Sequence, residues 1–408
     1  MKKNSLLFLM LILYCRMAVN GQGADSVALL KIKVVHETLR KEYAPDRRTA
    51  LFELEVLETM PLRLKLESTS SRAVEDFKEQ LKQKGLGAEL TEEVLPSVQL
   101  QEKIYGVASL SVANNRLRPA HPAELVSQTL LGTPVDILKK ERGYYLTRTP
   151  DGYISWVEND AVAVMNKEEF GKWQQSAKII FSAEYGHSYE EPSDRSGRVS
   201  DLVAGNILEV LGEKRKFYKV RYPDGRMGYV KKSEARNFTE WADAADPKAD
   251  DILKTARTLI GVPYLWGGTS IKGVDCSGFT KTSYYLNGII LARDASQQAL
   301  TGEQVDIYRN DTISMEKCLE NLKPGDLLFF SGGKSSDGTP RITHTAIYCG
   351  GGEFIQSAGR VKVSSLLKEA PNYDSYQTRC LVSARRILTA IGSAGISRIS
   401  QHSYYTRQ

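Results

Sequence analysis

Apolar and polar residues alternate along residues 62–66, Leu-Arg-Leu-Lys-Leu, and this alternation predicts a half-buried β-strand. From Ser71 onward the apolar positions recur at helical spacing, and Gly85 is placed to end the helix. Three residues form the apolar face of that helix: Val74, Phe77 and Leu81. The pattern predicts a small α/β domain over residues 24–98, whose role the sequence does not indicate.

The next two regions form an internal repeat. Residues 132–157 match residues 205–230 at a constant offset of 73 positions (205 − 132). Each copy contains short β-like runs, a charged turn and the sequence Pro-Asp-Gly, in which proline presets one backbone dihedral and glycine accepts a positive one. The repeat predicts two small β-barrels, at residues 99–166 and 175–240.

A third region, residues 246–388, mixes helical and strand patterns. A linker rich in Ala, Asp and Lys, residues 242–251, leads into it. The tail over residues 389–408 is rich in Ser, Ile, Arg and Tyr, and we expect it to lie on the surface or to be partly disordered. The predicted fold class is α+β: a small α/β domain, two β-barrels and a larger α+β domain.

The first residues predict export. Two lysines precede an apolar run over residues 6–14, and small and polar residues follow, which is typical of a secretory signal peptide over residues 1–21 with cleavage after Gly21. The apolar run is too short to span a membrane, and we expect no integral membrane span elsewhere. A lipid anchor at Cys15 is the less favoured alternative, because bulky Tyr14 precedes it. The predicted location is periplasmic or secreted.

Composition and charge exclude some classes. The 408 residues are 41% hydrophobic and 25% charged, which is ordinary for a globular protein. The net charge is +6, and three positive charges, Lys2, Lys3 and Arg16, lie in the segment expected to be removed, so 6 − 3 = 3 remain. This small surplus, without a basic run, predicts no nucleic-acid partner. We expect a monomer.

Four cysteines follow the predicted signal peptide: Cys276, Cys318, Cys349 and Cys380. They are too few for a disulfide scaffold, and without a Cys-x-x-Cys pair they predict no zinc or other metal site. We expect the last three to be buried as small hydrophobic residues, with one disulfide among them left open.

Cys276 has the best context for a nucleophile. The sequence Val-Asp-Cys-Ser-Gly-Phe at residues 274–279 continues into a helix-compatible stretch, so Cys276 is predicted at a helix N-terminus. Unpaired backbone N–H groups and the helix dipole at that position favour a thiolate.

The predicted base is His344. It lies in a strand-like run, residues 343–348, and a strand can aim an imidazole rigidly at a helix-borne cysteine. A Gly-Gly-Gly turn over residues 350–352 leads into a second strand-like run that contains Gln356. The side-chain oxygen of Gln356 is predicted to accept a hydrogen bond from the imidazole and to orient it.

Several motifs in this region occur in the order found in the NlpC/p60 family of papain-like cell-wall peptidases, and the stretch from residue 264 to 359 resembles that family. The motifs are Tyr-Leu-Trp-Gly-Gly at 264–268, Asp-Cys-Ser-Gly at 275–278, Arg-Asp-Ala-Ser-Gln at 293–297, Lys-Pro-Gly-Asp-Leu-Leu-Phe-Phe at 323–330 and Thr-His-Thr-Ala-Ile-Tyr at 343–348. With two preceding domains that resemble bacterial SH3 domains, the arrangement is similar to the γ-D-glutamyl-L-diamino acid peptidases of the dipeptidyl-peptidase VI group.

The resemblance implies a cysteine peptidase without a cofactor. Cys276 matches the family nucleophile and His344 the base, and Tyr264 matches a tyrosine beside the catalytic sulfur that helps to hold the oxyanion. Gln356 departs from the family, which usually has a second histidine there. A neutral amide supports an imidazolium less well than a charge does, which puts the rate in question more than the reaction.

The implied substrate is a peptidoglycan-derived stem peptide with a free N-terminal L-Ala, cut between γ-D-Glu and meso-diaminopimelate or L-Lys. Four residues match positions expected to bind it: Glu124, Tyr153, Asp275 and Ser277. Glu124 and Asp275 would bind the free amine through charge-assisted hydrogen bonds. Several of these residues have a structural alternative. Glu124 could be a solvated loop carboxylate, Tyr153 could belong to the barrel core, and Asp275 could cap the helix. Tyr264 could likewise only pack in the cleft wall.

Two other functions remain open at this point. The same scaffold could carry an amidase or acyl-transfer reaction, against which the amine-binding Glu124 argues. Alternatively, Gln356 could mark the decay of the site into a non-catalytic wall-binding protein, against which the retention of Cys276 and His344 argues.

Overall fold

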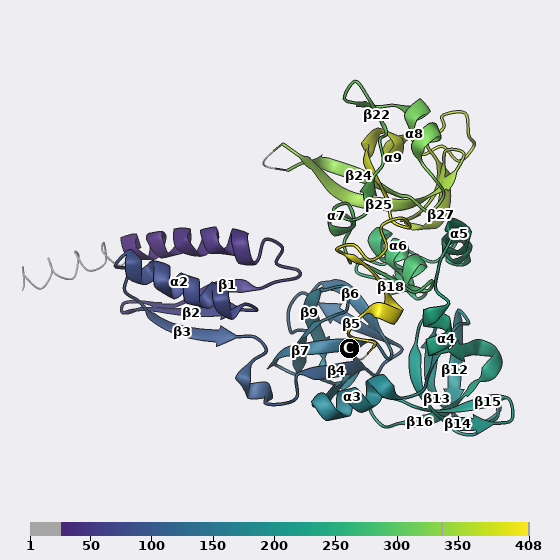
Figure 1. Cartoon of the computed structure of the whole chain (residues 1–408), viewed down its shortest axis with the longest axis horizontal. Helices are drawn as coiled ribbons and strands as arrows, with labels where there is room; N and C mark the ends of the chain where they lie inside the picture. Colours follow the sequence, from purple (N-terminus) through teal and green to yellow (C-terminus); the bar gives the residue numbers. More distant parts are fainter. Residues whose placement is uncertain (1–25, 336–337, 407–408) are drawn as a thin grey trace, which may run out of the picture. The chain divides into compact units, whose positions relative to one another are not determined.

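The computed structural model describes residues 26–335 and 338–406, so the predicted signal peptide and Cys15 lie outside the described residues. The chain divides into two compact units, residues 1–101 and 102–408, and each is described by itself (Figure 1). No helix of the described part is long and apolar enough to cross a membrane.

The first unit is an α/β fold. A helix over residues 26–43 precedes β1 (Phe52–Thr59), β2 (Leu62–Ser68), α2 (Ser71–Gln83) and β3 (Glu89–Val94), and a short 3-10 turn, Val98–Leu100, follows. The sheet order is β1-β2-β3, with β2 and β3 parallel. The predicted strand and helix are confirmed, and Val74, Phe77 and Leu81 are buried as expected. The sequence patterns did not predict the first helix, β1 or β3.

Two β domains open the second unit, one from β4 to β10 and one from β11 to β17. The first contains β4 (Tyr105–Ala108), β5 (Val112–Arg116), β6 (Leu125–Leu130), β7 (Pro134–Glu141), β8 (Tyr144–Arg148), β9 (Ile154–Glu158) and β10 (Val162–Met165). The second contains β11 (Lys178–Phe181), β12 (Tyr185–Tyr189), β13 (Arg198–Val203), β14 (Ile207–Lys214), β15 (Phe217–Arg221), β16 (Met227–Lys231) and β17 (Ala235–Asn237). Each domain is one seven-stranded sheet.

The internal repeat is visible in the strand boundaries. Strands β7, β8 and β9 correspond to β14, β15 and β16, and every one of their ends is shifted by the same 73 residues, as in Pro134 against Ile207 (207 − 134). Even the β-bulge recurs, between Ile137 and Lys139 in one copy and between Val210 and Gly212 in the other. The repeat in sequence is therefore a repeat in backbone geometry.

The last domain has the predicted α+β fold. Helices α3 (Lys167–Gln175) and α4 (Phe238–Asp243) precede it, and α5 (Ala249–Thr258) and α6 (Cys276–Tyr285) are its main helices. Its sheet order is β21-β28-β24-β25-β26-β27. Those strands are β21 (Glu303–Gln304), β24 (Leu327–Lys334), β25 (Pro340–Gly350), β26 (Glu353–Ala358), β27 (Arg360–Ser365) and β28 (Leu381–Arg386).

Shorter elements complete the domain: β18 (Thr269–Ser270), β19 (Gly273–Val274), β20 (Ile289–Leu291), α7 (Ala295–Gln298), β22 (Tyr308–Arg309), β23 (Thr312–Ile313), α8 (Met315–Asn321), α9 (Ser375–Cys380) and β29 (Ile396–Arg398).

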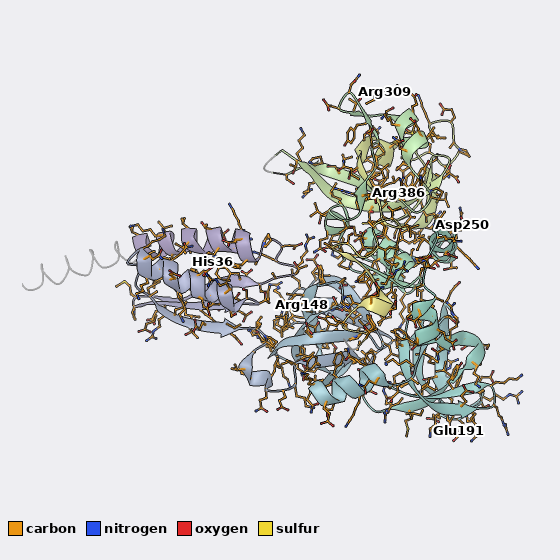
Figure 2. All side chains as sticks on the ribbon, viewed as in Figure 1. His36, Arg148, Glu191, Asp250, Arg309 and Arg386 are labelled. Atoms are coloured by element: carbon orange, nitrogen blue, oxygen red, sulfur yellow. The ribbon has the colours of Figure 1, made fainter. Side chains whose placement is uncertain are left out.

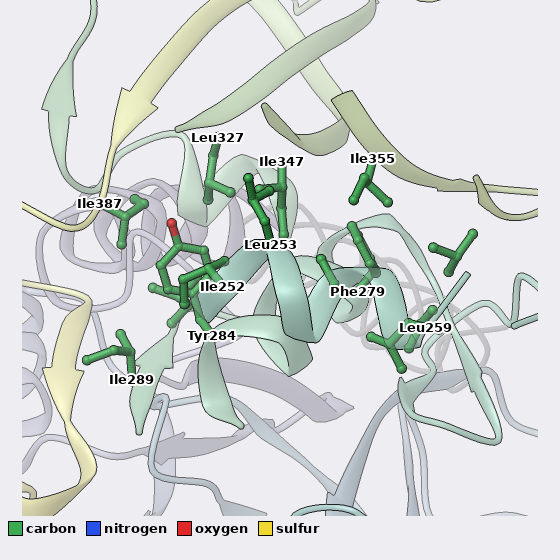
Figure 3. Close-up of a cluster of buried hydrophobic side chains, with 14 of the residues drawn as sticks. Ile252, Leu253, Leu259, Phe279, Tyr284, Ile289, Leu327, Ile347, Ile355 and Ile387 are labelled. Atoms are coloured by element: carbon green, nitrogen blue, oxygen red, sulfur yellow. The ribbon is translucent and has the colours of Figure 1, made fainter. Parts of the chain in front are cut away.

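The core of this domain fixes α6 against the sheet. Phe279 and Tyr284 of α6 are fully buried among aliphatic side chains from α5 and the central strands, including Leu327, Ile347 and Ile355 (Figure 3). One partly buried charge pair supports the sheet, since Arg386 of β28, which is labelled in Figure 2, donates to both carboxylate oxygens of Asp326, at 3.0 and 2.8 Å. Helix α6 is therefore held against the sheet by a closely packed apolar core.

The prediction for the tail is wrong over residues 396–405. Strand β29 pairs with β20, and Ile396, Ile399 and Tyr405 are buried. The Tyr404 hydroxyl donates to Asp136 of the first β domain at 2.5 Å, and the Tyr405 ring stacks on Phe238. The buried residues are interspersed with Ser, Arg and Gln, so composition alone indicated a solvated segment.

Candidate active site

Cys276 is the first residue of α6, as predicted. Asp275 is the N-cap, and its carboxylate accepts the backbone N–H of Gly278 at 2.6 Å. The loop over residues 264–268 lies so close that a Cβ on Gly278 would be 1.9 Å from the Gly268 carbonyl oxygen. Three residues of the Asp-Cys-Ser-Gly motif therefore have clear local roles. Asp275 caps the helix, Cys276 places the thiol at its first position, and Gly278 leaves room for the adjacent loop.

His344 lies on β25 beside this helix end. The Cys276 Sγ atom is 3.9 Å from the carbonyl oxygen of Thr343, the residue before His344. The imidazole Nε2 is 2.7 Å from Gln356 Oε1, and Gln356, on β26, has no exposed surface. The hairpin expected from the Gly-Gly-Gly turn and the predicted histidine–glutamine hydrogen bond are both present.

The thiol and the imidazole are both shifted toward their neutral forms. Burial raises the pKa of the Cys276 thiol to about 12, and the Asp275 carboxylate adds to the rise, whereas the backbone N–H groups of Thr345 and Ser277 oppose it. Burial also lowers the pKa of His344, against the Gln356 hydrogen bond and the Asp374 charge. At this helix N-terminus, burial and the Asp275 carboxylate outweigh the backbone N–H groups, and the balance favours a neutral thiol beside a neutral imidazole.

This electrostatic state predicts a particular pH dependence. Because burial lowers the pKa of His344 below its usual value of 6.5, the imidazole stays able to accept a proton down to that pH, and kcat/KM is expected to fall only below it. Alkylation of Cys276 by iodoacetamide, followed by peptide mass spectrometry, is expected to accelerate continuously up to at least about pH 9. A rate plateau near neutral pH would instead reveal a resting thiolate–imidazolium pair and contradict the prediction.

Asp275 is the centre of a buried network. Its two oxygens accept five hydrogen bonds, from the backbone of Gly267 and Gly278, from the Ser277 hydroxyl, and twice from the Arg293 guanidinium. The predicted capping role is thus confirmed, and its role toward a substrate amine stays a prediction. The Ser277 hydroxyl also accepts from Arg293, at 3.0 Å.

Arg293 is a residue whose role the sequence analysis missed. Its side chain is 1% exposed and pairs with Asp275 at 2.6 Å, and its Nε donates to Ser127 Oγ of β6 at 3.1 Å. Burial alone would lower the pKa of Arg293, but the Asp275 carboxylate raises it well above its usual value. The available signal was an arginine placed directly after the apolar run 289–292, where a charge is buried only if it is paired.

The two predicted tyrosines lie at this network. Burial raises the pKa of Tyr264, and the nearby Cys276 and Asp275 side chains raise it further, so its hydroxyl stays protonated. Tyr153, between β8 and β9, is 7% exposed, and its ring lies close enough to Arg293 to influence the pKa of that residue. Tyr153 is therefore buried beside the network, as the structural alternative also allowed.

The first β domain contributes Glu124. The Trp266 indole Nε1 donates to Glu124 Oε1 at 2.8 Å, and Glu124 is exposed. Close contacts fix this arrangement, because Thr269 donates twice to Gln128 at 3.0 Å and a Cβ on Gly267 would be 2.5 Å from the Leu125 carbonyl oxygen. The structure thus brings the predicted Glu124 to the loop that also carries Tyr264.

A second contact joins the first β domain to the helix of Cys276. Asp151, in the first Pro-Asp-Gly turn, forms an ion pair with Lys281 of α6, and its side chain is 1% exposed. The matching residue of the repeat, Asp224, pairs only within its own turn, with Arg226. The two copies therefore differ at this turn, and the turn of the first copy contacts the helix that begins at Cys276.

A buried thiol at a helix N-terminus, with a strand histidine held by a side-chain amide, is the arrangement of a papain-like cysteine peptidase. Residues 261–385 match the family model described as NlpC/P60 family. Residues 116–162 match the model described as bacterial dipeptidyl-peptidase Sh3 domain, and residues 189–235 the model described as bacterial SH3 domain. Residues 261–385 therefore form an NlpC/P60 domain of the cysteine peptidase type, and two bacterial SH3 domains precede it.

Similar proteins support this assignment. A gamma-D-glutamyl-L-lysine dipeptidyl-peptidase of Bacillus cereus is 29% identical over 57% of this chain and 67% of its own length. Dipeptidyl-peptidase 6 of Lysinibacillus sphaericus is 28% identical over 64% of this chain and 92% of its own. The crystal structure of an NlpC/P60 family protein from Bacillus cereus matches 70% of this chain and 99% of its own, with 25% identity and a TM-score of 0.56.

Proposed function

We propose that the enzyme hydrolyses the γ-D-Glu–diamino acid bond of peptidoglycan stem peptides with a free N-terminal L-Ala and releases L-Ala-D-Glu. The observation that carries the proposal is Glu124, an exposed carboxylate of the first SH3 domain. It is hydrogen-bonded to Trp266, in the loop over residues 264–268 that lies beside Cys276. Relatives of similar architecture are named for the γ-D-glutamyl-L-lysine bond, which supports the same bond here.

In the proposed reaction, His344 takes the thiol proton on Nδ1, the ring nitrogen that does not face Gln356, as Cys276 attacks the γ-carbonyl carbon. The protonated Tyr264 hydroxyl donates to the developing oxyanion. Collapse of the tetrahedral intermediate expels the diamino acid amine, which receives the proton from His344. Water, activated by the same imidazole, then releases the dipeptide from the acyl-enzyme.

The proposed substrate contacts explain why a dipeptide would leave. A free ammonium at the N-terminus of the peptide would bind Glu124, with Asp275 completing its charge-assisted hydrogen bonds. Tyr153 and Ser277 would line the same end of the site. An acylated N-terminus lacks the positive charge, and the ammonium of a longer peptide would lie away from Glu124, so neither would form this charge-assisted contact.

The proposal predicts strict discrimination between two peptides. L-Ala-γ-D-Glu-L-Lys is expected to be cut to L-Ala-D-Glu, and its N-acetylated copy to be cut at least about 100-fold more slowly, which corresponds to one lost charge-assisted hydrogen bond. Mass spectrometry of the products, with the Cys276→Ala protein as blank, measures both rates. Glu124→Gln is expected to remove most of the difference by slowing only the free peptide.

Other outcomes would point elsewhere. Equal cutting of both peptides by the unmodified enzyme would retain the peptidase and reject Glu124 as the amine ligand. Binding to sacculi without any product would favour a wall-binding protein, and release of ammonia or transfer products would favour the amidase or acyl-transfer reaction.

We further propose that the enzyme works as a monomer in the periplasm or outside the cell. Every residue assigned above to catalysis and binding belongs to the same chain, so the site requires no second copy. The substrate class is found in that compartment, and the predicted signal peptide would direct the chain there.

A further inference from the structure

The catalytic domain holds a charge that none of the proposed steps uses. Gln356 is fully buried, and while its Oε1 faces the His344 imidazole, its Nε2 donates to two acceptors, Asp374 Oδ2 at 2.8 Å and Ser364 Oγ at 2.9 Å. The chain of contacts therefore runs from the imidazole through the amide to a carboxylate. Asp374 lies in the segment between β27 and α9, outside every motif that the sequence analysis singled out.

Asp374 decides which way the amide of Gln356 points. A carboxylate can only accept hydrogen bonds, so it requires the NH2 group of the amide to face it. The carbonyl oxygen of the amide then faces His344, and Nε2 of the ring has to carry a proton to donate to it. Ser364 cannot impose this choice, because a hydroxyl both donates and accepts.

The orientation of the amide in turn sets the tautomer of His344. A neutral imidazole carries a single ring proton, and with that proton on Nε2 the lone pair is on Nδ1, where it can accept the thiol proton. A flipped amide would present its NH2 group to Nε2 and move the ring proton to Nδ1. The imidazole would then face the thiol with a donor and could not act as a base.

Asp374 is held in place independently of Gln356. Its Oδ1 accepts the backbone N–H of Gln377 and caps α9, and its own backbone N–H donates to Ser365 of β27 at 2.9 Å. Its carboxylate is thus fixed before any substrate binds. Its negative charge also reaches the ring, since it raises the pKa of His344 against the effect of burial.

We infer that Asp374 is a fourth, positioning member of the catalytic group, which orients Gln356, fixes the tautomer of His344 and supplies the negative charge that the neutral amide lacks. The inference rests on the proposed catalytic roles of Cys276 and His344. It explains how a glutamine can occupy the position where the family usually has a second histidine.

The test separates positioning from folding. Asp374→Ser keeps a good capping oxygen for α9 but is too short to reach Gln356. We expect kcat/KM to fall at least about 10-fold, and by less than the ~10⁴-fold seen when a triad member that sets the histidine tautomer is altered. Ser364→Ala, which removes the neutral partner of the same NH2 group, is expected to stay within about threefold of the unaltered enzyme. The acidic limb of the kcat/KM profile is expected to move to lower pH in Asp374→Ser, because the negative charge beside the imidazole is removed.

The same substitution made in a Gln356→Glu protein distinguishes a positioning role of Asp374 from a structural one. In Gln356→Glu both side-chain oxygens accept, so the tautomer no longer depends on Asp374, and the two carboxylates repel each other. Adding Asp374→Ser to Gln356→Glu should therefore cost nothing or increase kcat/KM. An equal loss in both backgrounds would assign Asp374 a structural role only, and less than a threefold loss in the unaltered background would also overturn the inference. Unchanged activity in Cys276→Ala would instead reject the proposed catalytic roles themselves.

Discussion

Replacing Cys276 with alanine is expected to lower kcat/KM by at least about 10⁴-fold, the largest effect of any single substitution in this protein. The substitution removes the only atom proposed to attack the substrate. Its structural cost is small, because sulfur forms only weak hydrogen bonds, such as the one of 3.9 Å to the Thr343 carbonyl oxygen, and alanine is a good helix former. Steady-state hydrolysis of L-Ala-γ-D-Glu-L-Lys measures the loss, and urea unfolding checks the fold.

A matched control is available in the same domain. Cys318 of α8 is fully buried, and its pKa is raised to about 11 by burial, so it resembles Cys276 as a thiol. Cys318→Ala is expected to lower the free energy of unfolding by about 1 kcal/mol and to leave kcat/KM within about threefold. Residual activity above about 1% in Cys276→Ala would show that another group performs the attack.

The second large effect concerns stability. Arg293→Met is expected to lower the free energy of unfolding by about 3–5 kcal/mol, because it leaves the Asp275 carboxylate buried without its cation. Activity should fall as well, since Asp275 caps the helix that begins at Cys276 and also holds the backbone of Gly267. Urea unfolding followed by circular dichroism measures the change in stability.

An arginine of similar pairing but different burial provides the comparison. Arg309, labelled in Figure 2, forms an ion pair with Glu316 at 2.9 Å, and its side chain is 54% exposed. Arg309→Met is expected to change the free energy of unfolding by less than about 0.5 kcal/mol. Equal effects of the two substitutions would show that the buried pair around Asp275 contributes no more than a solvated one.

Local patterns in the sequence were sufficient for part of this site. The cap, the thiol and the glycine of α6 are adjacent in the chain, and the hairpin of His344 and Gln356 spans 12 residues, so their geometry follows from short-range rules. The repeat was predictable for the same reason, because each copy carries its own turns.

The remaining partners depend on contacts that no local pattern encodes. Glu124 contacts Trp266 across 142 positions and Arg293 contacts Ser127 across 166, and both contacts exist only because the first SH3 domain packs on the catalytic domain. Asp374 was missed because its partner Gln356 lies 18 residues earlier, across an intervening strand. The tail was misjudged because its buried residues have no regular period in the sequence.

Residues 396–405 have a consequence for the order of events during synthesis. Tyr404 contacts Asp136, which is made 268 residues earlier, and Gln174 of α3 donates to the carbonyl of Ser403. Each SH3 domain contains its own sheet and can fold as it emerges from the ribosome. The contacts of residues 396–405 with Asp136 and α3, in contrast, can form only after those residues have been made. A nascent chain can therefore carry folded SH3 domains before these contacts have formed.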